Sequence, residues 1–159
     1  MIVVLNGPSS AGKSTLAAAV RDRLGANAAI VSLDRFFPMV AATRAHDWQL
    51  FATLTEAMLA TAVAFADRGF VTIVDTVFER AESLERLRAV FGERRHHLVA
   101  VTCPLDILEA RELARGNRRP GLARGQHDRV LQGAAYDLVL DTHACTLDDC
   151  ADRVVRLVV

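Results

Sequence analysis

The strongest constraint on the fold is a short glycine-containing segment close to the start of the chain. Residues 7–14 read Gly-Pro-Ser-Ser-Ala-Gly-Lys-Ser and match the pattern G-x-x-x-x-G-K-[ST]. The apolar run Ile2–Leu5 precedes this segment, and a helical pattern from Lys13 to Leu24 follows it. A strand, a glycine-containing loop and a helix in that order are the context that the pattern requires. The segment therefore predicts an α/β fold that begins with a buried strand.

The same segment has the residues needed to hold phosphate groups. Gly7 and Gly12 permit backbone conformations that a Cβ disfavours, so successive amide N–H groups can converge on phosphate oxygens. A helix that begins near Lys13 adds the positive end of its dipole, and the Lys13 ammonium can follow charge on the β- and γ-phosphates. The Ser14 hydroxyl can complete the oxygen shell of Mg²⁺. The alternative is an ordinary glycine-rich turn. The predicted nucleotide-binding residues are Gly7, Pro8, Ser9, Ser10, Ala11, Gly12, Lys13, Ser14 and Thr15.

Short β-branched runs alternate with longer helical patterns along the rest of the chain. This alternation is typical of a parallel sheet that is covered by helices on both faces. We expect strands near Ile2–Asn6, Ala28–Leu33, Val71–Val74, His97–Thr102 and Leu138–Leu140. We expect helices at Lys13–Leu24, Trp48–Arg68, Ala81–Phe91, Pro104–Arg115 and Leu147–Leu157. The prediction is a three-layer sandwich with a five-stranded parallel sheet, forming one domain over residues 1–159.

Composition narrows the classes of partner. Nineteen Lys and Arg balance nineteen Asp and Glu, so no overall basic field favours nucleic acid. The longest apolar stretch, around Ala57–Ala66, is short and predicts a helix rather than a membrane span. The three cysteines lack metal-site spacing, which favours free thiols. We expect a cytoplasmic protein that acts on small molecules without nucleic acid or membrane, and self-association stays open.

Two carboxylates follow predicted strands and should meet at the carboxyl edge of the sheet. Asp34 comes after the second strand, where it could accept the proton of a substrate hydroxyl that attacks the γ-phosphorus. It could equally cap the helical turn that contains Phe36 and Phe37. Asp75 ends the apolar run Thr72–Val74, which is the form of an element that organises Mg²⁺, although any strand can end in Asp.

Four arginines cluster around the breaker-rich residues 117–121. A closing loop could bring their guanidinium groups onto phosphate oxygens. The alternative is a solvated basic face paired with Glu109 and Glu112. The arginines are Arg111, Arg115, Arg118 and Arg119.

Several aromatic residues and histidines are open to a simpler interpretation. Trp48, Phe51 and Met58 recur at helical spacing, which favours a place in the core over a substrate platform. His96 and His97 stand near no Cys or carboxylate at metal-ligand spacing, so an edge or surface position is expected.

The residues together resemble the chloramphenicol phosphotransferase family. The resemblance runs through residues 6–14, Asp34, residues 75–78 and residues 101–103, and is most specific in residues 109–118 and 136–142. It implies that Asp34 is the catalytic base, that Lys13 and Ser14 serve phosphate and magnesium, and that Arg118 contacts nucleotide and contributes to catalysis. It also implies ATP as the donor and a primary hydroxyl of an antibiotic as the acceptor, which would confer self-protection.

The acceptor is the part that the resemblance leaves open. The segment between Pro38 and Trp48 is shorter than the family pattern, and Arg44, His46 and Asp47 bring charge into it. A kinase of another metabolite or nucleoside would use the same machinery. A nucleotide-sensing module that regulates a partner is an alternative of another class.

Overall fold

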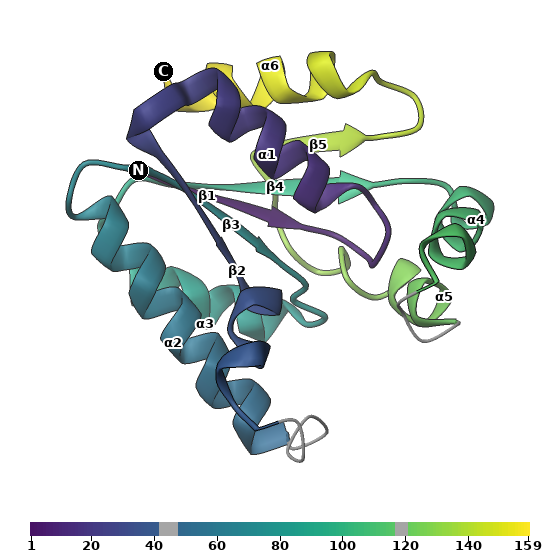
Figure 1. The fold of residues 1–159 in the computed structure, drawn as a ribbon, viewed down its shortest axis with the longest axis horizontal. Helices are drawn as coiled ribbons and strands as arrows, with labels where there is room; N and C mark the ends of the chain where they lie inside the picture. The colour runs from purple at the N-terminus through teal and green to yellow at the C-terminus, as the bar shows by residue number, and fades with distance from the viewer. Residues whose placement is uncertain (42–47, 117–120) are drawn as a thin grey trace.

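A five-stranded parallel sheet forms the centre of the molecule in the order β2-β3-β1-β4-β5 (Figure 1). The computed structural model describes residues 1–41, 48–116 and 121–159. The strands are β1 (Ile2–Asn6), β2 (Ala28–Ser32), β3 (Val71–Thr76), β4 (His96–Thr102) and β5 (Leu138–Asp141). The predicted parallel sheet and its strand number are confirmed.

Strand β3 is longer than the sequence pattern indicated. The apolar run ends at Val74, yet Asp75 and Thr76 continue the strand because they pair in register with Leu5 and Asn6 of β1. Asp has a low strand propensity, and here the tertiary pairing overrides it. As a result Asp75 and Thr76 are held rigidly at the edge of the sheet.

Helices occupy the predicted segments, and a further helix is present. The α-helices are α1 (Lys13–Leu24), α2 (Trp48–Ala66), α3 (Ala81–Phe91), α4 (Leu105–Arg115), α5 (Leu122–His127) and α6 (Leu147–Val158). Short 3₁₀ turns are η1 (Gly25–Asn27), η2 (Leu33–Arg35) and η3 (Phe37–Met39). The helix that the sequence did not predict is α5, which is too short to show a helical period.

A buried carboxylate explains why α5 forms. Glu112 of α4 accepts hydrogen bonds from Gly121 N at 2.8 Å and from Ala123 N at 2.9 Å. These amides belong to the start of α5, where helix N–H groups have no partner within the helix. The alternative interpretation of the arginine cluster placed Glu112 on a solvated face, but Glu112 is buried and stabilises the neighbouring helix.

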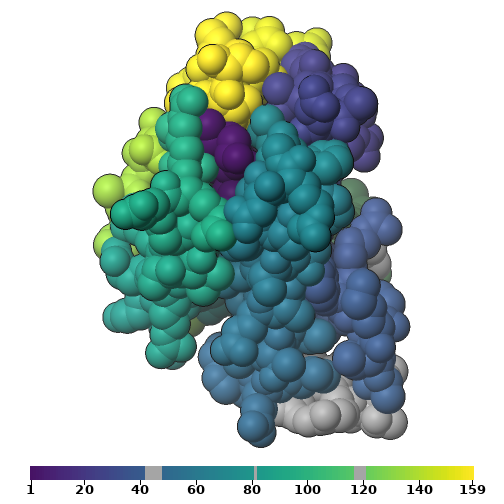
Figure 2. Space-filling view, turned by 90° about the vertical axis from the view of Figure 1, so that its left-hand side faces the viewer, coloured from purple at the N-terminus to yellow at the C-terminus, as the bar shows by residue number. Residues whose placement is uncertain are grey.

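The helices form a layer on each face of the sheet, and the alternation of side chains along the strands divides the core in two. Val3 and Ile73 pack with α1 and α6, whereas Val4 and Val74 pack with α2 and α3. Figure 2 shows α6 in yellow and α1 in purple together at one end of the molecule. Helices α4 and α5 lie beyond the carboxyl ends of the strands (Figure 1).

Helix α2 is long and apolar enough to cross a membrane by length and composition alone, which the sequence analysis did not predict. Its buried stripe packs against the sheet in the second part of the core. A core helix that covers a sheet passes the same test, so this property is weak evidence for a span. The stripe consists of Leu50, Leu54, Met58, Leu59 and Ala62.

Candidate active site

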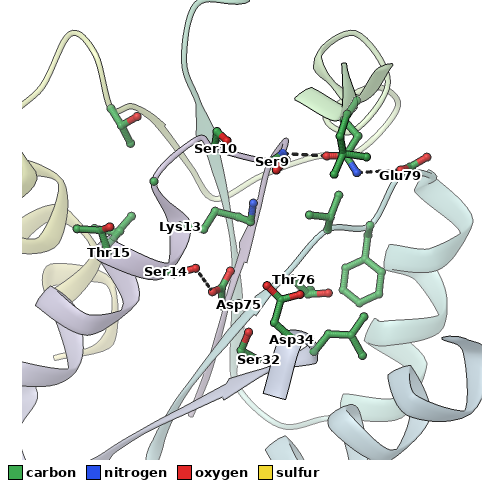
Figure 3. Close-up of a pocket in the computed structure, with 18 of the residues that line it drawn as sticks. Ser9, Ser10, Lys13, Ser14, Thr15, Ser32, Asp34, Asp75, Thr76 and Glu79 are labelled. Atoms are coloured by element: carbon green, nitrogen blue, oxygen red, sulfur yellow. Dashed lines mark hydrogen bonds between the residues drawn. The ribbon is translucent and has the colours of Figure 1, made fainter. Parts of the chain in front are cut away.

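A cavity of about 920 Å³ lies at the carboxyl edge of the sheet (Figure 3). The phosphate loop and Thr142 line one half of it, which we call the phosphate half. The turn after β2, the first residues of α2, Thr76 at the end of β3 and the loop between β3 and α3 line the other half, which we call the acceptor half. Residues from distant parts of the chain therefore line one cavity.

The phosphate loop is buried and tightly constrained. A Cβ on Gly7 would lie 2.0 Å from the carbonyl oxygen of Val101, so only glycine fits there. Gly12 has a φ of +91°, which L side chains disfavour. The Lys13 side chain is 7% exposed, and its Nζ donates to the carbonyl oxygens of Gly7 at 2.9 Å and Pro8 at 2.8 Å. The ammonium thus lies within the loop that it is predicted to serve.

Ser14 and Asp75 lie in direct contact. The Ser14 hydroxyl donates to Asp75 Oδ2 at 2.7 Å, joining the first turn of α1 to the end of β3. A hydroxyl and a carboxylate side by side supply the oxygen ligands that Mg²⁺ prefers, so the pair fits that ion. Among the described residues there is no cluster of three or more His, Cys, Asp or Glu side chains that could hold a metal.

Asp34 lies in η2 and lines the same cavity. The pairing of Ser32 with Asp75 brings the end of β2 beside the end of β3, and Asp34 follows two residues later. Ser32 holds the cap position of η2 and Phe36 that of η3, and Asp34 lies between them. Its two predicted roles, as a base and as a cap of the helical turn, stay predictions. Asp34 is exposed and faces the acceptor half.

The predicted arginines differ in their surroundings. Arg111 donates to Thr142 Oγ1 at 3.1 Å and to the Thr142 carbonyl at 3.2 Å. Thr142 in turn donates to the Ala11 carbonyl at 2.8 Å, so Arg111 braces the phosphate loop. Arg115 also lines the cavity.

Some residues that the sequence singled out lie outside the described residues. They are Arg118, Arg119, Arg44, His46 and Asp47. Glu109, which the alternative interpretation paired with the arginine cluster, forms an ion pair with Arg124 at 2.7 Å.

The aromatic residues of α2 are partly wrongly predicted. Met58 is buried as expected, but Trp48 is 76% exposed and lines the cavity. Its ring stacks on Phe51 with a centroid distance of 5.4 Å and an interplanar angle of 11°. Phe51 lies 6.3 Å from Phe37, so three rings face the acceptor half. Helical spacing could not distinguish this wall from core.

Two amide side chains missed by sequence reasoning connect the two halves. Gln126 Oε1 accepts from Ser9 N at 2.8 Å, and its Nε2 donates to Glu79 Oε1 at 3.0 Å. Asn6 Oδ1 accepts from Phe78 N at 2.8 Å, and its Nδ2 donates to the Tyr136 hydroxyl at 2.8 Å. Burial raises the pKa of Tyr136, which keeps this hydroxyl protonated. The sequence signal for Asn6 was its place as a polar residue at the end of an apolar strand, and Gln126 had no such signal.

The cysteines are free thiols, as predicted. Cys103 and Cys150 are buried, and burial raises the pKa of each thiol. Cys145 is less buried, and it lines the phosphate half together with Cys150. These thiols are therefore reporters of the phosphate half.

Comparison with known families identifies the chain. The sequence profile of the family described as chloramphenicol phosphotransferase-like protein matches residues 1–159. The chain belongs to that family. The Mycobacterium tuberculosis relative named "Putative O-phosphotransferase Rv2636" is 28% identical over 176 residues, covering 94% of this chain and 78% of the relative.

Solved structures show the same fold at low sequence identity. The Mycobacterium tuberculosis APS kinase CysC, solved with AMPPNP and APS, has a TM-score of 0.80 and 22% identity, covering 99% of this chain and 96% of that one. Shikimate kinase from Acinetobacter baumannii, solved with shikimate, has a TM-score of 0.70 and 16% identity, covering 99% and 92%. The Deinococcus radiodurans tunicamycin resistance protein has a TM-score of 0.70 and 16% identity, covering 99% and 94%. The fold is that of P-loop kinases.

Membership of the chloramphenicol phosphotransferase-like family indicates the class of reaction that the protein catalyses. The chain is a phosphotransferase of the P-loop kinase type that acts on a hydroxyl group. The sequence prediction of the family and of the fold is confirmed. The roles of individual residues in the cavity stay predictions.

Proposed function

We propose that this protein transfers the γ-phosphate of ATP to a hydroxyl of a small molecule of the chloramphenicol type. The observation that carries the proposal is the shared cavity, in which a phosphate loop and a carboxylate at the acceptor side face the same volume. Aromatic rings on the acceptor half suit an apolar or aromatic substrate. Modification of an antibiotic in the cytoplasm, where ATP is available, would protect the cell.

The residues present suit an in-line transfer. Loop amides and Lys13 would hold the nucleotide phosphates, and Arg115 could approach them from α4. Asp34 would accept the proton of the acceptor hydroxyl as its oxygen bonds to the γ-phosphorus and the bond to ADP breaks. Ser14 and Asp75 would hold Mg²⁺, which when bound neutralises charge on the phosphates.

A mass-spectrometric screen tests the proposal. Chloramphenicol and unrelated primary alcohols are incubated with the protein, ATP and Mg²⁺, and the products are examined for a gain of about 80 Da, one phosphoryl group. We expect transfer to at least one alcohol by the wild type and none by Lys13→Ala. Transfer that survives Lys13→Ala would contradict the proposed phosphate site.

The same screen distinguishes the rival functions. A product from another metabolite or a nucleoside, with none from chloramphenicol, would redirect the acceptor and leave the machinery unchanged. A protein that phosphorylates no alcohol, but changes its oligomeric state with nucleotide, would be a nucleotide-binding regulatory module. The position of Asp34 in the cavity favours the enzyme over the regulator.

A further inference from the structure

Two threonines of β3 carry hydroxyl groups that are unusual among the described residues. Thr72 is 0% exposed and Thr76 is 5% exposed, and the Oγ1 atom of each has no hydrogen-bond partner in the described structure. A buried hydroxyl without a partner is unfavourable, so native proteins rarely retain one without reason.

The two threonines point to the same face of the sheet but meet different surroundings. Side chains alternate along a strand, so Thr72, Val74 and Thr76 lie on the same face of the sheet. Val74 packs with residues of α2 and α3, so this is the face that those two helices cover. Asp75 points to the opposite face, where it contacts Ser14. Thr72 does not line the cavity, whereas Thr76 does.

Thr76 lines the acceptor half, the same half that Asp34 faces (Figure 3). The register of Ser32 with Asp75 puts the strand end that precedes Asp34 next to the strand end that contains Thr76. An ionised carboxylate only accepts hydrogen bonds, whereas a hydroxyl both donates and accepts. The two groups therefore offer different hydrogen-bonding partners to one bound molecule.

We propose that the Thr76 hydroxyl binds the acceptor and determines part of its specificity. The inference rests on the proposed function, since Asp34 is taken to receive the hydroxyl that is phosphorylated. Thr76 Oγ1 hydrogen-bonds a second polar group of the same molecule. The substrate class is then an alcohol with an apolar body and a further oxygen or nitrogen close to the reacting hydroxyl.

Three variants separate this role from a structural one. Thr76→Val removes the hydroxyl at nearly constant shape, Thr76→Ser keeps it, and Thr72→Val is the matched control on the same strand and face. Both valine variants should unfold at a slightly higher temperature, by about 2–4 °C, because each replaces an unpaired buried hydroxyl. Stability alone therefore cannot distinguish them.

Kinetics should distinguish them. The probe is chloramphenicol, or the alcohol of the screening panel that the wild type phosphorylates fastest. Thr76→Val should raise the acceptor KM about three- to ten-fold and leave the KM for ATP unchanged. Thr76→Ser should restore the wild-type value, and Thr72→Val should match the wild type in both constants.

The outcomes are decisive in each direction. If Thr76→Val behaves like Thr72→Val while the wild type phosphorylates the probe, the role of Thr76 is refuted and the proposed function stands. If Thr76→Val raises the KM for ATP as well, the hydroxyl does not act on the acceptor alone and the proposal fails. If the wild type phosphorylates no alcohol of the panel, the proposed function and the role of Thr76 fall together.

Discussion

The two halves of the cavity are built in opposite ways. The phosphate half comes largely from one continuous segment, residues 7–15, and its lysine is almost completely buried and hydrogen-bonded within the loop. The acceptor half is assembled from η2, η3, α2 and the loop after β3, and its largest ring, Trp48, is mostly exposed. Common chemistry is thus encoded locally, whereas the acceptor wall depends on tertiary packing.

This contrast predicts different sensitivities to substitution. Changes in the phosphate half should affect stability and nucleotide affinity together, because the loop is buried and leaves no room for a Cβ at Gly7. Changes at Asp34 and Trp48 in the acceptor half should affect binding or turnover of the acceptor alone, because these two side chains are exposed and contribute little to the core.

The largest effect on turnover is expected for Asp34→Asn. The amide keeps the size of the side chain but cannot take a proton, so kcat should fall by about 10²–10⁴-fold. ATP affinity, measured by calorimetry, should be unchanged because Asp34 faces the acceptor half. Unchanged turnover would remove Asp34 from the chemistry.

The largest effect on stability is expected for Gly7→Ala. The new Cβ would meet the carbonyl oxygen of Val101 at 2.0 Å, so the backbone must move and the free energy of unfolding should fall by about 3 kcal/mol. Urea denaturation measures this loss, and ATP affinity should fall with it. Gly69→Ala is the control for a glycine substitution without a clash: its φ is +87°, but a Cβ there would meet no atom within 4 Å, and the change should leave ATP affinity unchanged.

A smaller effect is expected for Trp48→Ala. Loss of the stacked ring should raise the acceptor KM about tenfold, with the KM for ATP and the melting temperature unchanged. Leu113→Ala removes an even more exposed apolar side chain, 82% accessible, that does not line the cavity. If both variants show the same acceptor KM, the aromatic wall has no part in binding.

The smallest effect concerns the three thiols, of which Cys145 and Cys150 line the phosphate half. Cys103 and Cys150 should react slowly with iodoacetamide at neutral pH, since burial raises the pKa of each and only the thiolate reacts. Cys145 should be labelled first, and saturating ATP should slow its labelling about fivefold by occupying the cavity that it lines. Mass spectrometry of the labelled peptides measures the rates. If the acceptor slowed the labelling of Cys145 as much as ATP does, Cys145 would not report on the phosphate half alone.

Raised thiol pKa values also give a pH dependence with a defined sign. Above the ordinary thiol pKa of 9.0, unfolded chains lose protons that native Cys103 and Cys150 retain, so the free energy of unfolding falls as the pH rises through the native pKa values. Below that range the thiols are protonated in both states and contribute no pH dependence.

The sequence predicted most of the fold because strand and helix periods are local properties. Ile2–Asn6 and Lys13–Leu24 were predicted to the residue, since the loop between them fixes both boundaries. Helix α5 was not predicted because its start is stabilised by Glu112, a contact across the chain that no local pattern contains.

The site was predicted unevenly for the same reason. The phosphate loop could be read from residue type and spacing, and the approach of Asp34 to Asp75 followed from parallel strands. The exposure of Trp48 and the bonding of Gln126 to Ser9 N could not be predicted, because each depends on which element packs beside it. A helical period marks an apolar face but not whether that face meets protein or substrate.

The contacts of Asn6 bear on how the acceptor specificity of such enzymes can evolve. Its side chain holds the main chain of Phe78, through Phe78 N at 2.8 Å and Phe78 O at 3.3 Å, and makes no demand on the ring. A substitution at position 78 would therefore change the side chain while Asn6 still holds the main chain in place. Diversification of the acceptor could proceed by single substitutions while the donor machinery one residue away keeps its shape.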